Sequence, residues 1–404
     1  MGQTILISLV SDQTIPNVQL IKQLKEQIAK HLFVTTSAME QKGIGSWIET
    51  ACDISTDVIV VDEFSFADIN SRLYEYDFEK YDKIIVNLTG GTKIMTLVAY
   101  DFFKNLGADI YYVTGQNNSY IKVFPSEKNN VNTFTTPATL HEYLTAYGFT
   151  IKRSTPSGVP FEQTEKIFKS LCAIDVAEHV EALRFIVSKR DKTINNEDFD
   201  RVANFLSAIG YTPEVCGCLS KAETKYLSGD WFEEYVGLKI KHELNLSDEN
   251  IFIGTELTKA LSQKVKNSPY DLLGEVSDNE TDNRNEMDVM FIHNNKFYSI
   301  ECKSSIVAYR TIMLNGEYVD KPYNILGETI YKSDSLAKRF GLYANTAIVT
   351  LSDFAAYCAD DEVGKHKTKI KQMEGYINRA NLSNIKLIDK RLLMSSDSLF
   401  DLLK

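Results

Sequence analysis

The sequence predicts an α/β protein with two sheet-containing domains joined by a helical segment. Its 404 residues are too many for one ordinary hydrophobic core. Over the first 125 residues, continuous apolar runs alternate with amphipathic stretches, which indicates a mainly parallel sheet with helices on both faces. Near residue 290, two short apolar runs flank an Asn-rich turn, which predicts a β-hairpin. We therefore expect domains at residues 1–150 and 223–404, with a helical connector at 151–222.

The N-terminal domain is expected to alternate strands and helices. Each predicted strand is a short apolar run, and the last one closes a hairpin with its predecessor. The predicted strands are Thr4–Val10, His31–Val34, Asp57–Val61, Lys83–Asn87, Asp109–Val113 and Tyr120–Phe124. The predicted helices between them are Asn17–Ala29, Ser65–Tyr74 and Thr92–Asn105.

The rest of the chain is expected to be helical first and mixed later. Residues 151–159 are rich in Ser, Pro and Gly and are interpreted as a linker, and residues 164–208 have a helical, strand-poor pattern. Further helices are expected at Lys225–Leu244 and near Glu328–Phe340. The strands expected after the connector are Asn250–Phe252, Met287–Ile292, Lys296–Cys302 and Thr346–Val349.

Composition and charge limit the classes of function. The net charge of −11 argues against a protein that binds nucleic acid over its whole surface, although it allows a local basic groove. The basic run Lys365–Lys371 is the candidate for such a groove, and a solvated helix face is its alternative. Six scattered cysteines match no zinc or disulfide spacing. Without a membrane-length apolar run or a signal-peptide pattern, we expect a cytoplasmic protein.

The predicted hairpin carries a charged cluster. Side chains alternate along a strand, so Glu301 and Lys303 project from one face while Cys302 points the other way. Asp288 lies on the partner strand. Two carboxylates and an ammonium on one face can hold a divalent cation against a phosphodiester, whereas the alternative is a surface hairpin with ordinary charges.

A second candidate site lies where the fourth predicted strand passes into a helix. The turn Asn87–Lys93 has paired glycines that let backbone approach a ligand, and the free amides of a helix start attract anions. The turn lacks the full spacing of a P-loop. The loop Ser11–Asn17 follows the first strand at the same carboxyl edge, where open α/β sheets bind ligands. A tight turn with a capping Thr is the alternative.

These two loops resemble the ligand loops of CARF domains, the Rossmann-like sensors of cyclic oligoadenylate in type III CRISPR immunity. With the hairpin cluster, the whole chain resembles the CARF effectors that carry a PD-(D/E)xK nuclease domain. The resemblance implies a homodimer that binds cyclic tetra-adenylate across its two-fold axis and thereby activates the nuclease. It assigns activator binding to Ser11, Asp12, Gln13, Thr14, Thr89, Gly90, Gly91, Thr92 and Lys93.

The spacing Asp-x12-Glu-x-Lys fits the PD-(D/E)xK pattern, although Met287 replaces the name-giving proline. The family pattern also implies an acidic residue on a preceding helix, for which Glu233 is the first choice and Glu234 the second. By this resemblance Asp288, Glu301 and the Cys302 carbonyl would bind Mn²⁺ or Mg²⁺. Lys303 would orient or deprotonate water or stabilise transition-state charge. Lys332 resembles a family position that faces the active site, with a surface lysine as the alternative.

We therefore expect an activator-dependent, metal-dependent endonuclease in antiviral defence. The resemblance favours single-stranded DNA or RNA as substrate and allows nicking of duplex DNA. A CARF transcriptional regulator without cleavage activity is the alternative function. The sequence also leaves open whether the sensor domain degrades its own activator, which would need in-line positioning of a 2′-hydroxyl by residues such as Ser11 and Lys93.

Overall fold

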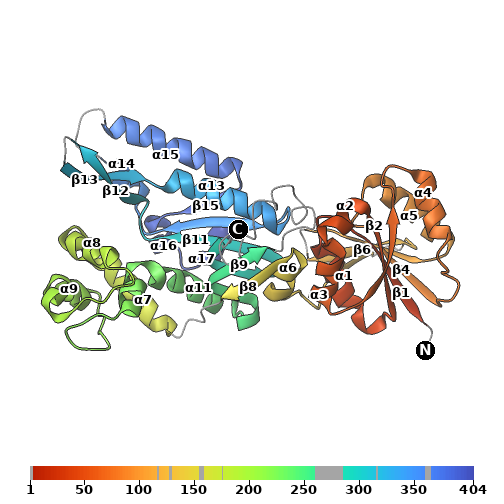
Figure 1. Ribbon diagram of the computed structural model, residues 1–404, viewed down its shortest axis with the longest axis horizontal. Coiled ribbons are helices and arrows are strands. Elements are labelled where there is room, and N and C mark those ends of the chain that lie inside the picture. Colours follow the sequence, from red (N-terminus) through yellow and green to blue (C-terminus); the bar gives the residue numbers. More distant parts are fainter. Residues whose placement is uncertain are drawn as a thin grey trace, which may run out of the picture.

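The chain folds around two β-sheets that lie side by side along its long axis (Figure 1). The computed structural model describes residues 3–115, 118–126, 130–153, 159–174, 176–259, 285–314, 317–359 and 365–404. Within these residues, no helix is both long enough and apolar enough to cross a bilayer.

The N-terminal sheet has seven strands in the order β3-β2-β1-β4-β5-β6-β7. β1 to β5 are parallel, and β6 and β7 are antiparallel additions at one edge. The strands are β1 (Thr4–Leu9), β2 (Lys30–Thr36), β3 (Thr56–Val61), β4 (Lys83–Asn87), β5 (Asp109–Val113), β6 (Ser119–Phe124) and β7 (Val131–Thr133).

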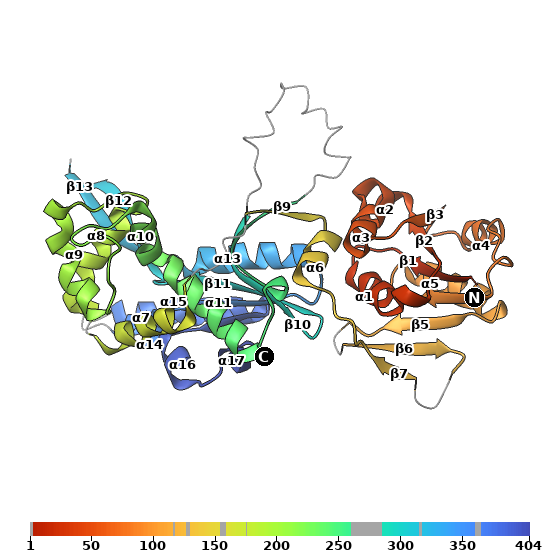
Figure 2. The same cartoon turned by 90° about the horizontal axis from the view of Figure 1, so that it is seen from below.

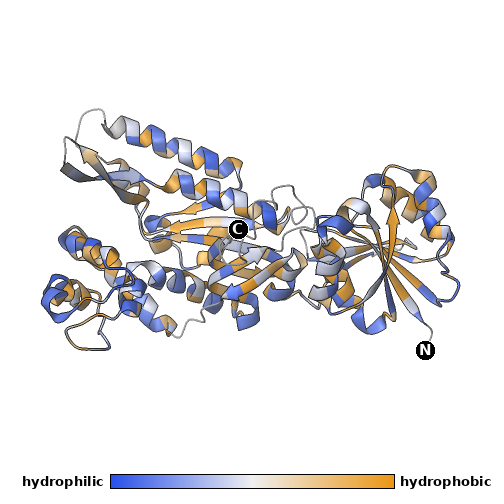
Figure 3. Ribbon diagram, in the orientation of Figure 1, coloured by the Kyte–Doolittle hydropathy of each residue, from blue (hydrophilic) through white to orange (hydrophobic). Residues whose placement is uncertain are grey.

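Helices cover both faces of this sheet. The helices are α1 (Ile15–Leu24), α2 (Ser37–Lys42), α3 (Ile44–Cys52), α4 (Phe66–Tyr74), α5 (Lys93–Asn105) and α6 (Leu140–Ala146). Leu6 of β1 packs into the core beneath α1, α3 and α6, whereas Ile5 and Ile7 pack beneath α4 and α5. The continuous apolar run of β1 follows from this burial on both faces, and Figure 3 shows it as hydrophobic colour along the central strands.

The C-terminal sheet has six strands in the order β15-β14-β11-β10-β9-β8. β10 and β11 form the antiparallel hairpin, and β14 pairs in parallel with β11. The strands are β8 (Phe149–Arg153), β9 (Ile251–Lys259), β10 (Asn285–His293), β11 (Lys296–Lys303), β14 (Asn345–Thr350) and β15 (Ile385–Ile388). A separate two-stranded hairpin of β12 (Val307–Leu314) and β13 (Glu317–Asn324) projects from the far end (Figure 2).

The helices of the second half divide into a connector and a cover for this sheet. The connector helices are α7 (Phe161–Ala173), α8 (Val180–Ser188), α9 (Asn196–Ala208) and α10 (Lys221–Lys225). The covering helices are α11 (Trp231–Leu244), α13 (Leu326–Ala337), α14 (Phe354–Cys358), α15 (Lys365–Leu382), α16 (Lys390–Ser395) and α17 (Leu399–Leu403). Phe168 of α7 stacks on Tyr235 of α11 with ring centroids 4.3 Å apart, so the connector shares the core of the C-terminal sheet.

The predicted fold class is confirmed, with corrections to single elements. The interpretation of residues 151–159 as a linker is wrong for 151–153, because these residues belong to β8 and pair with β9. Residues 154–158 of that linker lie outside the described residues. The helix expected at Asn17–Ala29 ends at Leu24 and continues as one short 3-10 turn.

The helix expected at Lys225–Leu244 is not continuous. A π-helical turn, Tyr226–Asp230, separates α10 from α11, with non-helical backbone at Gly229. Elements that are not expected from the sequence include α2, α3 and the hairpin of β12 and β13. The domain boundaries at 150 and 222 stay predictions.

Candidate functional site

The β10–β11 hairpin brings Asp288 and Glu301 together at one place in the C-terminal sheet. Val289 pairs with Ile300, so the register continued by one residue places Asp288 opposite Glu301. Both carboxylates are buried, with 6% and 5% of their surface exposed. The backbone amide of Cys302 donates to Asp288 Oδ2 at 2.7 Å, which fixes this carboxylate against the neighbouring strand. The side chain of Cys302 lies in the hydrophobic core on the opposite face, as alternation predicts.

Two lysines neutralise Glu301. Lys303 Nζ lies 2.7 Å from Glu301 Oε1 and 3.6 Å from Asp288 Oδ2, so one ammonium bridges the two strands. Lys332 Nζ from α13 donates to both oxygens of Glu301, at 2.9 and 3.2 Å. The Lys332 side chain is 46% exposed, yet its charged end reaches the buried carboxylate. Lys332 is thus partly exposed at the surface, and it also contacts the carboxylate cluster.

The carboxylates differ in their electrostatic surroundings. Burial raises the pKa of Asp288 to about 6, and the negative charge of Glu301 adds to this effect. Burial also works to raise the pKa of Glu301, but Lys303 and Lys332 outweigh it and lower that pKa. Burial alone would lower the pKa of Lys303, whereas Asp288 and Glu301 raise it, so the ammonium stays charged.

Glu233 on α11 is the third carboxylate of this region. Burial raises its pKa to about 8, and repulsion by Asp288 is the next cause, which places Glu233 near the hairpin cluster. Glu233 lies beside β9: a Cβ added at Gly254 of that strand would be 4.0 Å from Glu233 Oε2. Glu234 lies instead near Tyr226, whose raised pKa it contributes to. The electrostatic neighbours of the two residues therefore favour Glu233 over Glu234.

The donor atoms fit a hard divalent cation. Two buried carboxylates and the Cys302 carbonyl are oxygen ligands of the kind that Mg²⁺ and Mn²⁺ prefer. Lys303 Nζ donates to that carbonyl at 3.2 Å, so the carbonyl oxygen lies in the same cluster. Among the described residues, no three His, Cys, Asp or Glu side chains form a ready-made metal cage. A two-carboxylate site is nevertheless usual for Mg²⁺, which keeps several waters and takes phosphate oxygens as further ligands.

The second predicted site lies at the carboxyl edge of the N-terminal sheet. β1 and β4 are adjacent strands whose chains leave toward opposite sides of the sheet, which is a topological switch point. Asn87 at the end of β4 donates to Asn17 Oδ1 at 2.8 Å, and Asn17 donates to the Leu9 carbonyl at 3.0 Å. These buried amides tie the loop after β1 to the loop after β4.

Gly90 and Gly91 are required by shape. A Cβ at Gly90 would lie 2.0 Å from the Leu9 carbonyl oxygen, closer than any real contact, and 3.4 Å from Ser11 Oγ. Gly91 has φ +72°, a left-handed conformation that glycine adopts without strain. Thr92 then caps α5 by accepting the Met95 amide at 3.2 Å. The loop therefore presents backbone at a helix start, as predicted.

The remaining predicted residues of this edge divide by what they contact. Thr89 is engaged inside the loop, because its hydroxyl donates to Asn87 Oδ1 at 2.6 Å and accepts from the Val113 amide at 2.7 Å. Asp12 pairs with Lys42 at the end of α2, at 2.7 Å. Thr14 is fully buried, and Lys93 is exposed at the start of α5.

Gln13 contacts the C-terminal half of the chain. Its Oε1 accepts the backbone amide of Leu342 at 3.0 Å and the hydroxyl of Tyr147 at 3.4 Å. Leu342 and Tyr147 are not expected at this loop from the sequence, because no local pattern marks either of them. Only the tertiary fold brings them to the loop.

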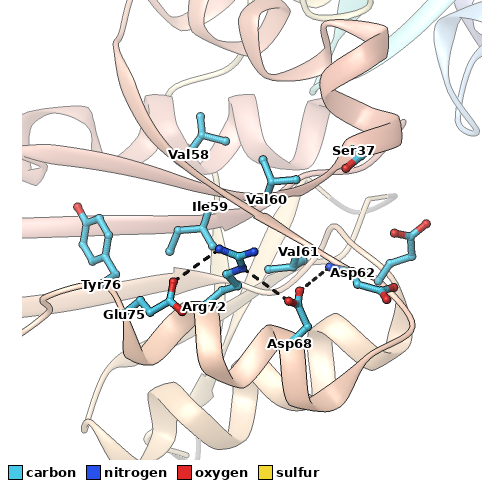
Figure 4. A pocket seen from close by; sticks show the side chains of 11 residues that line it. Ser37, Val58, Ile59, Val60, Val61, Asp62, Asp68, Arg72, Glu75 and Tyr76 are labelled. Carbon is cyan, nitrogen blue, oxygen red and sulfur yellow. Dashed lines mark hydrogen bonds and ion pairs between the residues drawn. The ribbon is translucent and has the colours of Figure 1, made fainter.

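A pocket of about 620 Å³ lies apart from both sites, along the edge strand β3 (Figure 4). Arg72 of α4 spans it between Asp68 and Glu75, at 3.6 and 3.7 Å, beneath the exposed Val58 and Val60. None of the residues predicted for binding or catalysis lines this pocket.

Comparison with known proteins supports the interpretation of the N-terminal half. Residues 5–143 match the family model of the Card1 CARF domain. The CARF part of the predicted resemblance is therefore confirmed for about the first third of the chain, and the nuclease part stays a prediction. No curated protein sequence matches the chain.

Solved structures show the fold of the whole chain. Protein VC1899 from Vibrio cholerae superposes with a TM-score of 0.68 at 17% identity, over 97% of this chain and 96% of its own. Can2 from Sulfobacillus thermosulfidooxidans, in complex with cyclic tetra-adenylate, superposes with a TM-score of 0.67 at 19% identity, over the full length of both chains. A type III CRISPR defence DNA nuclease activated by cyclic oligoadenylate superposes with a TM-score of 0.52 at 16% identity, over 87% of this chain and 45% of its own.

Proposed function

We propose that this protein is a metal-dependent endonuclease of type III CRISPR defence that cyclic oligoadenylate, in particular cyclic tetra-adenylate, activates. Its substrate would be single-stranded DNA, RNA or both, with nicking of duplex DNA as a further activity. The observation that carries the proposal is the convergence of Asp288, Glu301 and Lys303 on one face of the β10–β11 hairpin. The CARF match and the shared fold with Can2 support it.

The oxygen donors of Asp288, Glu301 and the Cys302 carbonyl would hold Mn²⁺ or Mg²⁺. The ion would polarise a phosphoryl oxygen and make water more acidic when bound. Asp288 is suited to ligation because the Cys302 amide holds it in place. Glu301 is suited because the lysines on either side lower its pKa and keep it ionised.

The lysines would act on charge that develops during cleavage. Lys303 lies between the two carboxylates and stays protonated, so it can orient water or stabilise negative charge on the transition state. Lys332 would hold Glu301 in its orientation from α13. Glu233, with a pKa raised to about 8, can hold a proton near neutral pH, and so accept or deliver one at this site.

The activator would bind at the carboxyl edge of β1 and β4. The Gly90–Gly91 turn presents backbone amides at the start of α5, and this arrangement favours anionic phosphates. Ser11, Asp12, Thr14, Thr89, Thr92 and Lys93 would surround the ligand, and Gln13 belongs to the same loop. A second copy of the chain would complete the site across a two-fold axis, so we propose a homodimer.

Cleavage of labelled single-stranded DNA and RNA with Mn²⁺ tests the proposal. Cleavage by the wild-type protein should need the metal, should increase with cyclic tetra-adenylate and should be lost in Glu301→Ala. The variant should keep its melting temperature in Mn²⁺-free buffer within a few degrees and should still bind labelled activator. Full cleavage by Glu301→Ala would refute the assignment of the site. Duplex binding without cleavage would instead support a transcriptional regulator.

A further inference from the structure

We infer that Gln13 couples the activator loop to the cleavage site through the end of α13. This inference rests on the proposed function, since it concerns how one proposed site controls the other. It assigns Gln13 a positioning role in place of the ligand contact expected from the sequence. The contact joins residues 329 positions apart in the chain.

The contact begins at the loop after β1. Gln13 lies between Ser11, which approaches the Gly90 turn, and α1, which begins at Ile15. Its side-chain oxygen accepts the Leu342 amide at 3.0 Å and the Tyr147 hydroxyl at 3.4 Å. Gly341, with φ +91°, leaves space here: an added Cβ would lie 2.1 Å from the Tyr147 hydroxyl and 3.2 Å from Gln13 Oε1. Ligand-induced movement of this loop would therefore act directly on residues 341 and 342.

Leu342 stands two residues beyond the 3-10 turn that follows α13, the helix that carries Lys332. α13 ends at Ala337 and continues as the 3-10 turn Lys338–Phe340, so displacement at residue 342 is transmitted to a short rigid element. Phe340, the last residue of that turn, stacks on Phe149 of β8 and on Phe297 of β11, with ring centroids 4.8 and 4.7 Å away, and so ties the turn to both strands. The Tyr143 hydroxyl donates to the Phe340 carbonyl at 2.7 Å. The same helix delivers Lys332 to Glu301.

The surroundings leave room for movement. A cavity of about 480 Å³ lies beside the contact and is lined by Gly115, Leu342, Tyr343 and Asn345, among others. Gly115 comes from the N-terminal half, whereas the other three come from the loop before and the start of β14. The hydrogen bond of Gln13 therefore joins the two halves of the chain next to this cavity. Small shifts of the loop after β1 can then reposition the end of α13.

A matched pair of glutamine substitutions tests the inference. Gln13→Met keeps the length of the side chain and removes its acceptor. Gln23→Met makes the same change on α1. Among the described residues, Gln23 Oε1 accepts from the Thr135 and Thr136 amides at 2.9 and 3.2 Å and from the Thr135 hydroxyl at 3.3 Å, all in the N-terminal half. Gly341→Ala disrupts the contact from the other side, away from the activator loop.

Two readouts are compared in the full-length protein with saturating cyclic tetra-adenylate as the probe. The first is the ratio of cleavage rates with and without activator, and the second is amide hydrogen exchange at Leu342. Loss of the contact should lower the ratio by roughly tenfold in Gln13→Met and Gly341→Ala, whichever arrangement the contact stabilises, since couplings of 5–150-fold are typical. Activator should alter Leu342 exchange in the wild type and in Gln23→Met but not in Gln13→Met.

The outcomes separate the two proposals. Wild-type activation that persists in Gln13→Met and Gly341→Ala would overturn the inference and leave the proposed function standing. Failure of Gln13→Met to bind labelled activator would also overturn it, because Gln13 would then be a ligand contact. A third outcome is a wild-type protein without activated cleavage in which the activator alters Leu342 exchange, and does so only when Gln13 is present. This result would refute the proposed nuclease function and support the inferred role of Gln13.

Discussion

The two candidate sites are built by opposite means. The N-terminal edge is shaped by backbone, through Gly90, Gly91 and the buried amides of Asn17 and Asn87. The C-terminal site is shaped by charged side chains, and ion pairs hold its buried carboxylates. Added atoms should therefore impair binding at the N-terminal edge, whereas removal of charge should impair cleavage at the C-terminal site. Substitutions at single residues test this difference.

The largest effect is expected from removing the bridging ammonium. Lys303→Met should lower the activated cleavage rate by roughly 10²–10⁴-fold, since Lys303 lies 2.7 Å from Glu301 and 3.6 Å from Asp288. Single-turnover kinetics with saturating activator measure this. The affinity for labelled activator should be unchanged. A rate within threefold of the wild type would show that the ammonium serves only to balance buried charge.

The next largest effect is expected from a change of shape at the carboxyl edge of the N-terminal sheet. Gly90→Ala should weaken activator binding by roughly tenfold or more, because its Cβ would lie 2.0 Å from the Leu9 carbonyl and the turn must move. Overpacking of this kind also costs about 1–3 kcal/mol of unfolding free energy. Isothermal titration with cyclic tetra-adenylate and urea unfolding measure the two effects.

Gly375→Ala is the matched control. Gly375 lies in α15, where an added Cβ meets nothing within 4 Å. This change should leave activator binding intact and stabilise the protein by about 0.5–1 kcal/mol, because alanine favours the helix. Equal binding by both variants would refute the backbone-shaped site.

A smaller effect is expected at Lys332, which holds Glu301 from the side and is partly exposed. Lys332→Met should lower the cleavage rate by about tenfold, as removal of an orienting partner typically does. Lys338→Met is the control, because within the described part of the chain Lys338 forms its ion pair with the nearby Asp334, on the solvent side. A loss for Lys332→Met as large as that for Lys303→Met would place both lysines in equivalent roles.

The smallest effect is expected on the pH dependence of the unfolding free energy, through a buried histidine of the N-terminal sheet. Burial, with help from Lys25 and Lys30, lowers the pKa of His31 on β2 to about 4. Below about pH 6.5 the unfolded chain binds a proton at this position that the folded chain does not, so the unfolding free energy falls as pH drops from 6.5 toward 4.

The slope should be about 1 kcal/mol per pH unit near pH 5.5. Urea unfolding of His31→Leu between pH 7 and 5 should lack this component, whereas His141→Leu, at an exposed position of α6, should retain it. Identical pH profiles for the wild type and His31→Leu would show that His31 has the same pKa in the folded and the unfolded chain.

Local sequence predicts the parts of the molecule whose determinants are close together. The buried strands, the capped start of α5 and the hairpin register follow from apolar runs, Thr92 and the Asn-rich turn. The alternation that predicts Glu301 and Lys303 on one face is confirmed by their ion pair. Cys302 in the core confirms the other face.

The parts that sequence reasoning missed depend on distant contacts. β8 looks like a linker until β9, about a hundred residues later, supplies its hydrogen-bonding partner. The π turn before α11 breaks a helix that propensity alone would continue. The contact of Gln13 with Leu342 could not be predicted either, because nothing in the sequence marks Leu342 as its partner.

Activator dependence of cleavage tests whether the carboxyl edge of the N-terminal sheet controls catalysis at the cluster of Asp288, Glu301 and Lys303. The measurement is the rate at which the wild-type protein cleaves labelled single-stranded DNA and RNA in Mn²⁺, with and without cyclic tetra-adenylate. The account predicts cleavage that the activator increases and that both Gly90→Ala and Glu301→Ala reduce. Equal cleavage with and without activator, or cleavage that survives in Glu301→Ala, would contradict it.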